Sequence, residues 1–279
     1  MTAGLPAFLS VARGETPLLV SIPHTGTEIP VGIADRLVSP WLARKDADWW
    51  VEHLYGFAEK LGATVVRTAI SRTVIDVNRD PSGASLYPGQ ATTGLCPTTS
   101  FDGEPLYHPR AEPDDDEVAE RRGLYFEPYH AALAAEIARL RQAHPRIVLY
   151  DCHSIRSVVP RLFSGELPQL NLGTNNGRSC DSALERVALE ACRESPWGVV
   201  LNGRFTGGWI TRHYGDPAAG VHALQMELAC RGYMDEPSIV GPDNWPTPYD
   251  PHRAEPMRAF LEKLLRTLLG WAEQERIPA

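Results

Sequence analysis

Two histidines stand where two strand-like segments of this chain end. His24 follows the segment Pro-Leu-Leu-Val-Ser-Ile-Pro, and His153 follows Arg-Ile-Val-Leu-Tyr-Asp-Cys. In an open α/β sheet, ligands bind outside the carboxyl ends of the strands. Two imidazoles delivered to that edge from different strands could bind one metal ion. A carboxylate between them in the sequence would complete the three protein ligands of a catalytic zinc.

The third ligand is therefore expected to be a carboxylate, and Asp48 is the first candidate. Asp46 is a plausible N-cap for a helix over residues 46–60. Because residues i and i+2 of a helix do not face the same way, only one of the two aspartates is expected at the metal. Glu28, four residues after His24 on a proline-flanked loop, is a further alternative.

A general base is predicted at Glu227, which closes the apolar segment His-Ala-Leu-Gln-Met-Glu. A carboxylate inside such a strand is costly unless it has a partner or a task. Burial would raise its pKa toward the range in which it can take a proton from water at the metal. A salt-bridged carboxylate at a strand end is the alternative interpretation.

Arginines flank these segments in the sequence: Arg72, Arg79, Arg156, Arg204 and Arg212. A guanidinium group binds a carboxylate through two parallel hydrogen bonds. Several of them near one metal would suit a substrate with one or two carboxylates. Arg156 follows His153 by three residues, and Arg212 follows a Gly-Gly turn at 207–208.

Nucleophilic catalysis is the competing chemistry. Cys152 and His153 are neighbours, but neighbouring residues of a strand point to opposite faces and should not form a catalytic pair. Asp151 is expected either to orient His153 or to accept from backbone amides. The chain contains neither a Gly-x-Ser-x-Gly elbow nor a GxxxxGK phosphate loop. A metal-dependent hydrolase is favoured over a non-catalytic metal or amino-acid binding protein, which would not need a base such as Glu227.

The elements that must position these residues alternate along the chain. Strands are expected at 17–22, 63–67, 73–77, 146–151, 198–202 and 221–227, and helices at 46–60, 117–143, 181–194 and 252–275. Residues 80–112 are expected to form a long loop of the kind that is often functional. The alternation predicts an α/β fold with a mostly parallel sheet and helices on both faces. With no shift in composition, residues 1–279 are expected to form a single catalytic domain.

Composition excludes several function classes. A formal net charge of -8 over 279 residues argues against a nucleic-acid-binding surface. No apolar stretch approaches the ~20 residues that span a bilayer, and the N-terminus lacks the pattern of a signal peptide. The five cysteines are scattered without a CxxC pair, which is typical of a reduced, cytoplasmic protein. The oligomeric state stays open.

A series of motifs covers nearly the whole chain. The motifs are Ser-Ile-Pro-His-Thr-Gly at 21–26, Asp-Ala-Asp-Trp at 46–49, Ser-Arg-Thr-Val-Ile-Asp-Val-Asn-Arg at 71–79, Ala-Thr-Thr-Gly-Leu-Cys-Pro at 91–97, Tyr-Asp-Cys-His-Ser-Ile-Arg-Ser at 150–157, Asn-Leu-Gly-Thr-Asn-Asn-Gly at 171–177, Asn-Gly-Arg-Phe-Thr-Gly-Gly-Trp-Ile-Thr-Arg-His-Tyr-Gly at 202–215, Gln-Met-Glu-Leu at 225–228 and Tyr-Met-Asp-Glu at 233–236. In these motifs and their order the chain resembles the N-formylglutamate deformylases (N-formylglutamate amidohydrolases) of bacterial histidine degradation.

The resemblance implies a three-layer α/β/α fold with a mostly parallel mixed sheet, similar to zinc carboxypeptidase-like (phosphorylase/hydrolase-like) folds. It implies hydrolysis of N-formyl-L-glutamate to L-glutamate and formate, the last step of a histidine degradation pathway. A metal-dependent amidase or deacylase acting on another N-acyl amino acid or on a peptidoglycan fragment is the alternative. Carboxypeptidase-like relatives carry His-x-x-Glu after the first strand, whereas this chain has His24-Thr-Gly-Thr27. The carboxylate ligand must therefore come from elsewhere, which keeps Asp48 first.

These residues can be assigned roles in a metal-dependent hydrolysis. Zn²⁺, or another divalent metal, is expected on His24, Asp48 and His153, with Glu227 as the base. The metal, with an arginine or His213, would stabilise the oxyanion. The candidates for binding the substrate carboxylates are Arg72, Arg79, Arg156 and Arg212. The expected partner is this small acidic substrate, with no nucleic acid and no membrane.

Overall fold

The computed structural model describes residues 5–274. Its strands are β1 (Leu9–Ala12), β2 (Leu18–Ile22), β3 (Thr64–Thr68), β4 (Ile147–Ile155), β5 (Leu170–Gly173), β6 (Val199–Leu201) and β7 (Val221–Ala229). Its α-helices are α1 (Val31–Ala34), α2 (Val51–Leu54), α3 (Asp115–Arg121), α4 (Glu127–Ala143), α5 (Ser182–Arg193), α6 (Trp209–Tyr214) and α7 (Pro251–Glu273). Short 3₁₀ turns are η1 (Leu42–Arg44), η2 (Ala58–Leu61) and η4 (Cys230–Gly232), and η3 (Arg122–Phe126) is π-helical.

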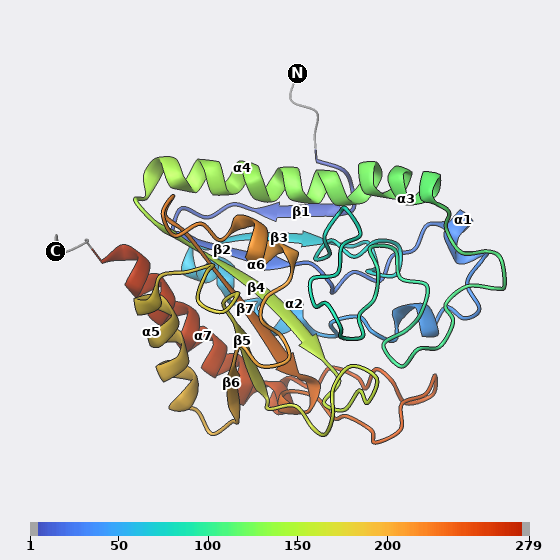
Figure 1. Cartoon of the computed structure of the whole chain (residues 1–279). Helices are drawn as coiled ribbons and strands as arrows, with labels where there is room; N and C mark the ends of the chain where they lie inside the picture. The colour runs from blue at the N-terminus through green and yellow to red at the C-terminus, as the bar shows by residue number, and fades with distance from the viewer. Residues whose placement is uncertain (1–4, 275–279) are drawn as a thin grey trace.

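The strands form one mixed sheet of seven, in the order β1-β3-β2-β4-β7-β5-β6 (Figure 1). The central strands β3, β2, β4 and β7 run parallel to one another. β1 is antiparallel to β3 at one edge, and β5 is antiparallel to β7 near the other, with β6 parallel to β5. The predicted α/β fold with a mostly parallel mixed sheet is confirmed. The likeness to zinc carboxypeptidases stays a prediction.

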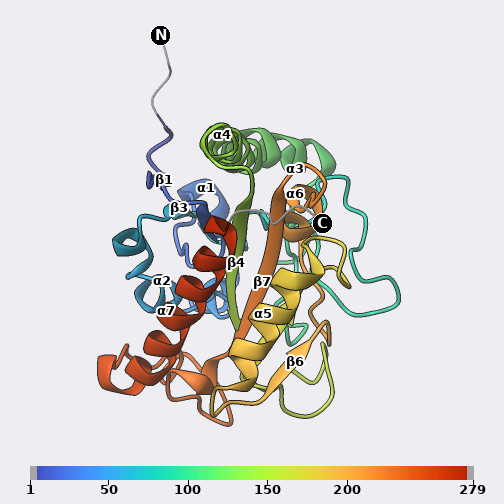
Figure 2. The same cartoon turned by 90° about the vertical axis from the view of Figure 1, so that its left-hand side faces the viewer.

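Helices cover both faces of this sheet. On one face α2, α5 and α7 bury an apolar cluster that includes Tyr150 and Cys152 of β4. Figure 2 shows α5 and α7 on this face of the sheet. On the other face α4 packs over β2 and β4 and shares a second cluster with Leu19 and Leu149. Because strand side chains alternate in direction, Asp151 lies on the α4 face and Cys152 opposite. Cys152 is fully buried in the first cluster, so the expectation that it does not pair with His153 is confirmed.

Two predicted elements are wrong. Residues 73–77 form a turn rather than a strand, although Val74, Ile75 and Val77 are buried in the cluster on the α4 face. These apolar side chains fill the cluster, but their backbone does not join the sheet. The N–H of Asp76 donates instead to the carbonyl of Leu95, which lies in the long loop over 80–112. The predicted helix over 46–60 reduces to the single turn α2 followed by η2.

The other long elements agree with the sequence. The segment 115–143 is helical throughout, through α3, η3 and α4, and Asp114 caps it by accepting from the N–H of Glu117. The last helix ends at Glu273, and residue 275, its predicted end, lies outside the described residues. The sequence patterns did not predict β1, β5 or α6, each of which is only four to six residues long. Among residues 5–274, none of the helices has the combination of length and hydropathy needed to cross a bilayer.

Candidate metal centre and its cleft

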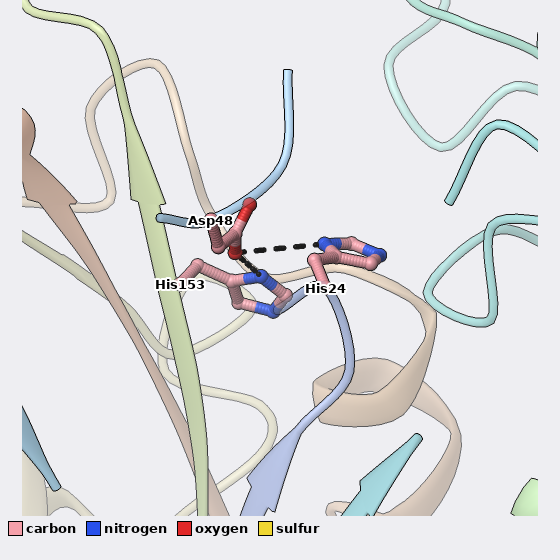
Figure 3. A group of neighbouring side chains, drawn as sticks. All are labelled: His24, Asp48 and His153. Atoms are coloured by element: carbon pink, nitrogen blue, oxygen red, sulfur yellow. Dashed lines mark hydrogen bonds and ion pairs between the residues drawn. The ribbon is translucent and has the colours of Figure 1, made fainter. Parts of the chain in front are cut away.

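Three metal-ligating side chains meet at the carboxyl ends of β2 and β4. His24 follows β2, His153 lies within β4, and Asp48 comes from the loop before α2. Each offers one ligand atom, and these atoms all lie within 4.8 Å of one another. Figure 3 shows the carboxylate of Asp48 facing both imidazoles. Its Oδ2 lies 3.0 Å from Nδ1 of His153 and 3.7 Å from Nδ1 of His24. This group could hold a metal ion.

Carboxylates on the far side of each ring orient the two histidines. Nε2 of His24 lies 2.7 Å from Asp76, and Nε2 of His153 lies 2.9 Å from Asp151. A carboxylate that accepts from Nε2–H leaves the lone pair of Nδ1 facing the centre of the group, as is usual for metal-binding histidines. Nδ1 of His24 is buried and has no hydrogen-bond partner. Since buried polar atoms are nearly always satisfied, this atom fits a metal ligand.

The electrostatics of the group favour a cation. Burial acts to raise the pKa of Asp48, but the hydrogen bond with His153 and the charge of the nearby His24 hold it below its usual value. Burial alone would lower the pKa of His153, whereas Asp151 and Asp48 raise it well above the usual range. Positive charge between these residues, whether a proton or a metal ion, is therefore stabilised.

Local structure explains why Asp48 rather than its alternatives joins the histidines. The N–H of Asp48 donates to the carbonyl of His24, and Oδ2 accepts from the N–H of Ser154. Asp46 instead accepts from the N–H of Phe101. It is not the cap of α2, whose N-cap position is Trp50.

The remaining alternative, Glu28, lies at the surface. Its backbone bridges to Ile70, and it is not a member of the metal-ligating group. Of the carboxylates that the sequence offered, the structure brings Asp48 to the two histidines.

Glu227 stands beside this group on the next strand. It pairs in register with His153 across β4 and β7, and its side chain is on the same face because the two strands are parallel and adjacent. It is 7% exposed, and Gln225 donates to its Oε2 at 3.2 Å. Burial raises the pKa of Glu227 to about 7. A carboxylate with this pKa can exchange protons at neutral pH.

A cleft opens above these residues. His24, His153 and Glu227 line it together with Arg72 and Arg79. The remaining lining residues are Asn78, Tyr87, Ala91, Thr92, Thr93, Phe101, Ile155, Leu162, Arg204, Phe205, Gly208 and Gln225. A cleft with both cationic and apolar walls suits a small anionic molecule with an aliphatic part.

The two predicted arginines in the cleft lie close to the metal-ligating group. Arg72 is buried over the ring of Phe101 and donates to Asp76 at 2.7 Å and to Asp48 at 3.4 Å. Arg79 donates to the backbone and hydroxyl oxygens of Thr93. Arg72 therefore adds positive charge beside Asp48.

Three other predicted residues lie away from the cleft lining. Arg156 pairs with Asp46 and Asp102. Arg212 donates to the carbonyls of Gly207 and Leu86. His213 is an exposed residue of α6, stacked on Trp209 with ring centroids 4.8 Å apart. Their proposed roles in substrate binding and oxyanion stabilisation stay predictions that the geometry does not favour.

The sequence does not single out every residue of the site. Asp76 falls in the predicted strand 73–77, although a carboxylate in the apolar segment Thr-Val-Ile-Asp-Val carries the same signal as Glu227. Asn78, which donates to Asp151 at 3.1 Å, and Gln225 had no such signal. Arg204 is one of the arginines that flank these segments, but nothing in the sequence distinguishes it from the others.

The chain is similar to known proteins in sequence and in fold. Residues 16–234 match the family model described as N-formylglutamate amidohydrolase. N-formylglutamate deformylases from Pseudomonas putida and Pseudomonas aeruginosa are 44% and 45% identical over 267 residues, covering 95% of this chain and 97% of each relative. The crystal structure of an N-formylglutamate amidohydrolase from Ralstonia eutropha superposes with a TM-score of 0.78 at 23% identity, covering 96% of this chain and 99% of that one. A gene product of Agrobacterium tumefaciens has a TM-score of 0.69 at 19% identity, with 95% and 96% coverage. At these identities, the two structures support the fold alone.

Proposed function

The chain belongs to the N-formylglutamate amidohydrolase family, and we propose that it hydrolyses N-formyl-L-glutamate to L-glutamate and formate. One observation carries the proposal: the group of His24, Asp48 and His153 lies beside a buried carboxylate, Glu227, in a cleft lined by arginines. The deformylase names of its Pseudomonas relatives support the choice of substrate.

We propose Zn²⁺ as the metal, with another divalent ion as the alternative. Two imidazole nitrogens and one carboxylate oxygen are a donor set typical of catalytic zinc, and the unpartnered Nδ1 of His24 supports it. When bound, zinc would polarise the formyl carbonyl and lower the pKa of a water molecule toward ~7. Asp76 and Asp151 would keep the two imidazoles in the tautomer that such binding needs.

Glu227 is the proton carrier in this proposal. As a carboxylate it takes a proton from the water that attacks the formyl carbon. It then gives that proton to the leaving amine as the C–N bond breaks, which returns Glu227 to its starting state. The side-chain amide of Gln225 donates a hydrogen bond to Oε2 of Glu227. In this proposal the proton is therefore transferred at Oε1. The pKa of about 7 suits both directions of transfer.

The arginines near the metal-ligating group complete the site. We assign oxyanion stabilisation to Arg72 rather than to His213, because Arg72 is buried in the cleft and touches Asp48. A cation placed where negative charge develops lowers the barrier most when it is shielded from water. Arg79, in the same wall, is the candidate for the α-carboxylate of the substrate.

We also propose a pathway and a compartment for this reaction. Release of glutamate and formate would complete a histidine degradation pathway, as the resemblance implies. All five cysteines are free and buried, which supports a place in the cytoplasm.

A substrate panel tests the function. Formate release would be followed with N-formyl-L-glutamate and N-formyl-L-aspartate, and acyl release with N-acetyl-L-glutamate and a muropeptide. The highest kcat/KM is expected for N-formyl-L-glutamate. If another substrate exceeds it tenfold or more, the deformylase assignment is wrong and the alternative deacylase is favoured. No turnover of any substrate by metal-loaded protein would favour a binding protein.

A further inference from the structure

One cationic group in the cleft has an unused hydrogen-bond donor. Nε and Nη2 of Arg204 donate to the carbonyls of Leu162 and Ala91 at 2.7 and 2.9 Å. Nη1 is buried and has no partner. Within residues 5–274, Arg204 forms no ion pair with a carboxylate. A buried N–H of a charged group without an acceptor is costly, so this donor fits a ligand that arrives from outside the chain.

The other two arginines of the cleft differ in this respect. Arg72 pairs with Asp76 and Asp48, and Arg79 approaches Asp76 at 3.6 Å. Their charge is therefore shared with carboxylates of the protein. Burial lowers the pKa of Arg204 and the charge of Arg79 acts in the same direction, while Tyr87 and Glu227 act against them. An incoming carboxylate would relieve both effects at Arg204.

The guanidinium of Arg204 is also held in place before a ligand arrives. Its central carbon lies 5.1 Å from the ring centroid of Tyr87 and 5.2 Å from that of Phe205. Two aromatic neighbours and two backbone carbonyls fix the plane of the group. A fixed guanidinium loses little entropy when it binds a carboxylate, which increases both affinity and selectivity.

The position of Arg204 indicates which carboxylate it would bind. In N-formylglutamate the α-carboxylate is attached to the carbon that bears the reacting amide, whereas the side-chain carboxylate is farther from that amide. Arg72 and Arg79 contact Asp76, which holds the ligand His24. Arg204 contacts no metal ligand and none of the carboxylates that orient them. We propose that Arg204 is the specificity residue that binds the side-chain carboxylate of the substrate, an inference that rests on the proposed function.

The test compares two substrates that differ only in that group, N-formyl-L-glutamate and N-formyl-L-glutamine. Their kcat/KM values would be measured for the wild-type protein and for Arg204→Gln. We expect the variant to lose on the order of 10- to 100-fold on the glutamate substrate and little on the glutamine substrate. The ratio of the two values in one preparation does not depend on how much of the protein is folded, so a partly unfolded variant still gives an answer.

Arg212→Gln is the matched comparison. Arg212 packs over the same ring of Tyr87 at 4.9 Å and also donates to backbone carbonyls, but it does not line the cleft. Its substrate ratio should stay near that of the wild type.

The possible outcomes separate the two proposals. A wild-type protein that is active on N-formyl-L-glutamate while Arg204→Gln keeps its ratio would overturn the role of Arg204 alone. If the ratio of kcat/KM on the glutamate substrate to that on the glutamine substrate falls in Arg212→Gln and not in Arg204→Gln, the side-chain carboxylate is bound by Arg212. A metal-loaded wild-type protein that releases no formate from N-formyl-L-glutamate would overturn the proposed function, and this inference with it.

Discussion

Two carboxylates outside the cleft lining determine the orientation of His24 and His153. Asp76 and Asp151 take the Nε2 side of the two imidazoles, so both rings turn Nδ1 toward Asp48. Asp76 is fully buried, and it is stabilised as an anion by Arg79, His24 and Arg72 despite the cost of burial. A charged network of this kind fixes ring orientation before any metal is present.

The role of Glu227 can be tested by the change Glu227→Gln, which keeps the shape of the side chain and removes the base. We expect kcat to fall on the order of 10²- to 10⁴-fold, with metal content unchanged, because Glu227 is not in the metal-ligating group. Steady-state kinetics and elemental analysis check this. A variant that keeps more than a tenth of wild-type kcat would contradict the assignment of Glu227 as base.

The pH dependence of activity follows from the same residue. Burial raises the pKa of Glu227 to about 7, and only the carboxylate form accepts a proton from water. Activity should therefore rise with pH through about 7 and level off above it, with kcat/KM falling about tenfold per unit below. A rate profile between pH 5 and pH 9 measures this, and a flat profile would be incompatible with Glu227 as the titrating base.

The same shift also predicts how Glu227 affects stability. A carboxyl group with a folded pKa above its unfolded value contributes stability at low pH and loses it as pH rises through the folded pKa. Glu227→Gln should therefore unfold at pH 8 at a temperature no lower than the wild type. This makes thermal unfolding at pH 8 a control for intact folding of that variant.

At the scale of single residues, the sequence predicts which residues lie together where a polar residue ends or interrupts a strand-like segment. His24, His153 and Glu227 each end or interrupt an apolar, β-branched segment, and the structure brings them to one place. The arginines carried no such signal, because a guanidinium group can project from any element. Only contacts between segments distant in sequence show that Arg204 lines the cleft and Arg156 does not.

At the scale of elements, the side chain of Asn78 connects the short helix α6 to the metal-ligating group through hydrogen bonds. Asn78 accepts from the N–H of Ile210 at 2.8 Å through Oδ1 and donates to Asp151 through Nδ2. Its backbone N–H donates to Asp76. Gly208, at the N-cap of α6, lies directly against this amide. The turn before α6 therefore helps to orient the carboxylates behind both histidines.

This arrangement predicts a specific effect of Gly208→Ala. A Cβ at this position would lie 2.4 Å from Nδ2 of Asn78, so the amide must move and its bond to Asp151 must weaken. Loss of such outer contacts typically costs about 10- to 100-fold in metal affinity or activity. The effect would be measured as the zinc dissociation constant and kcat.

Gly32→Ala in α1 is the control for that change, because nothing lies within 4 Å of its Cβ position. It should behave like the wild type in both assays. Equal effects of the two substitutions would show that the contact with Asn78 does not matter for the site.

The wrong elements show the limit of sequence patterns at this scale. The segment 73–77 has β-branched residues and reads as a strand, yet the sheet edge beyond β3 is taken by β1. Its residues therefore pack as a buried turn, and Asp76 turns toward His24. Pairing between strands is a tertiary property that a local pattern does not contain.

At the scale of the whole molecule, the site joins segments that are distant in the chain. Asp48 and His153 are 105 residues apart, and β2 and β4 pair in parallel, so their carboxyl ends lie at the same edge of the sheet. The long elements and the order of their alternation could be predicted, since burial and periodicity determine them. The strand order β1-β3-β2-β4-β7-β5-β6 could not, because each crossover depends on which faces pack against which helices.

The most direct measurement is formate release from N-formyl-L-glutamate by the purified protein, before and after chelation and with zinc added back. A zinc-dependent deformylase should release formate, lose that activity on complete metal removal and regain it with zinc. Release that continues after elemental analysis shows the protein to be metal-free would contradict the metal centre of His24, Asp48 and His153.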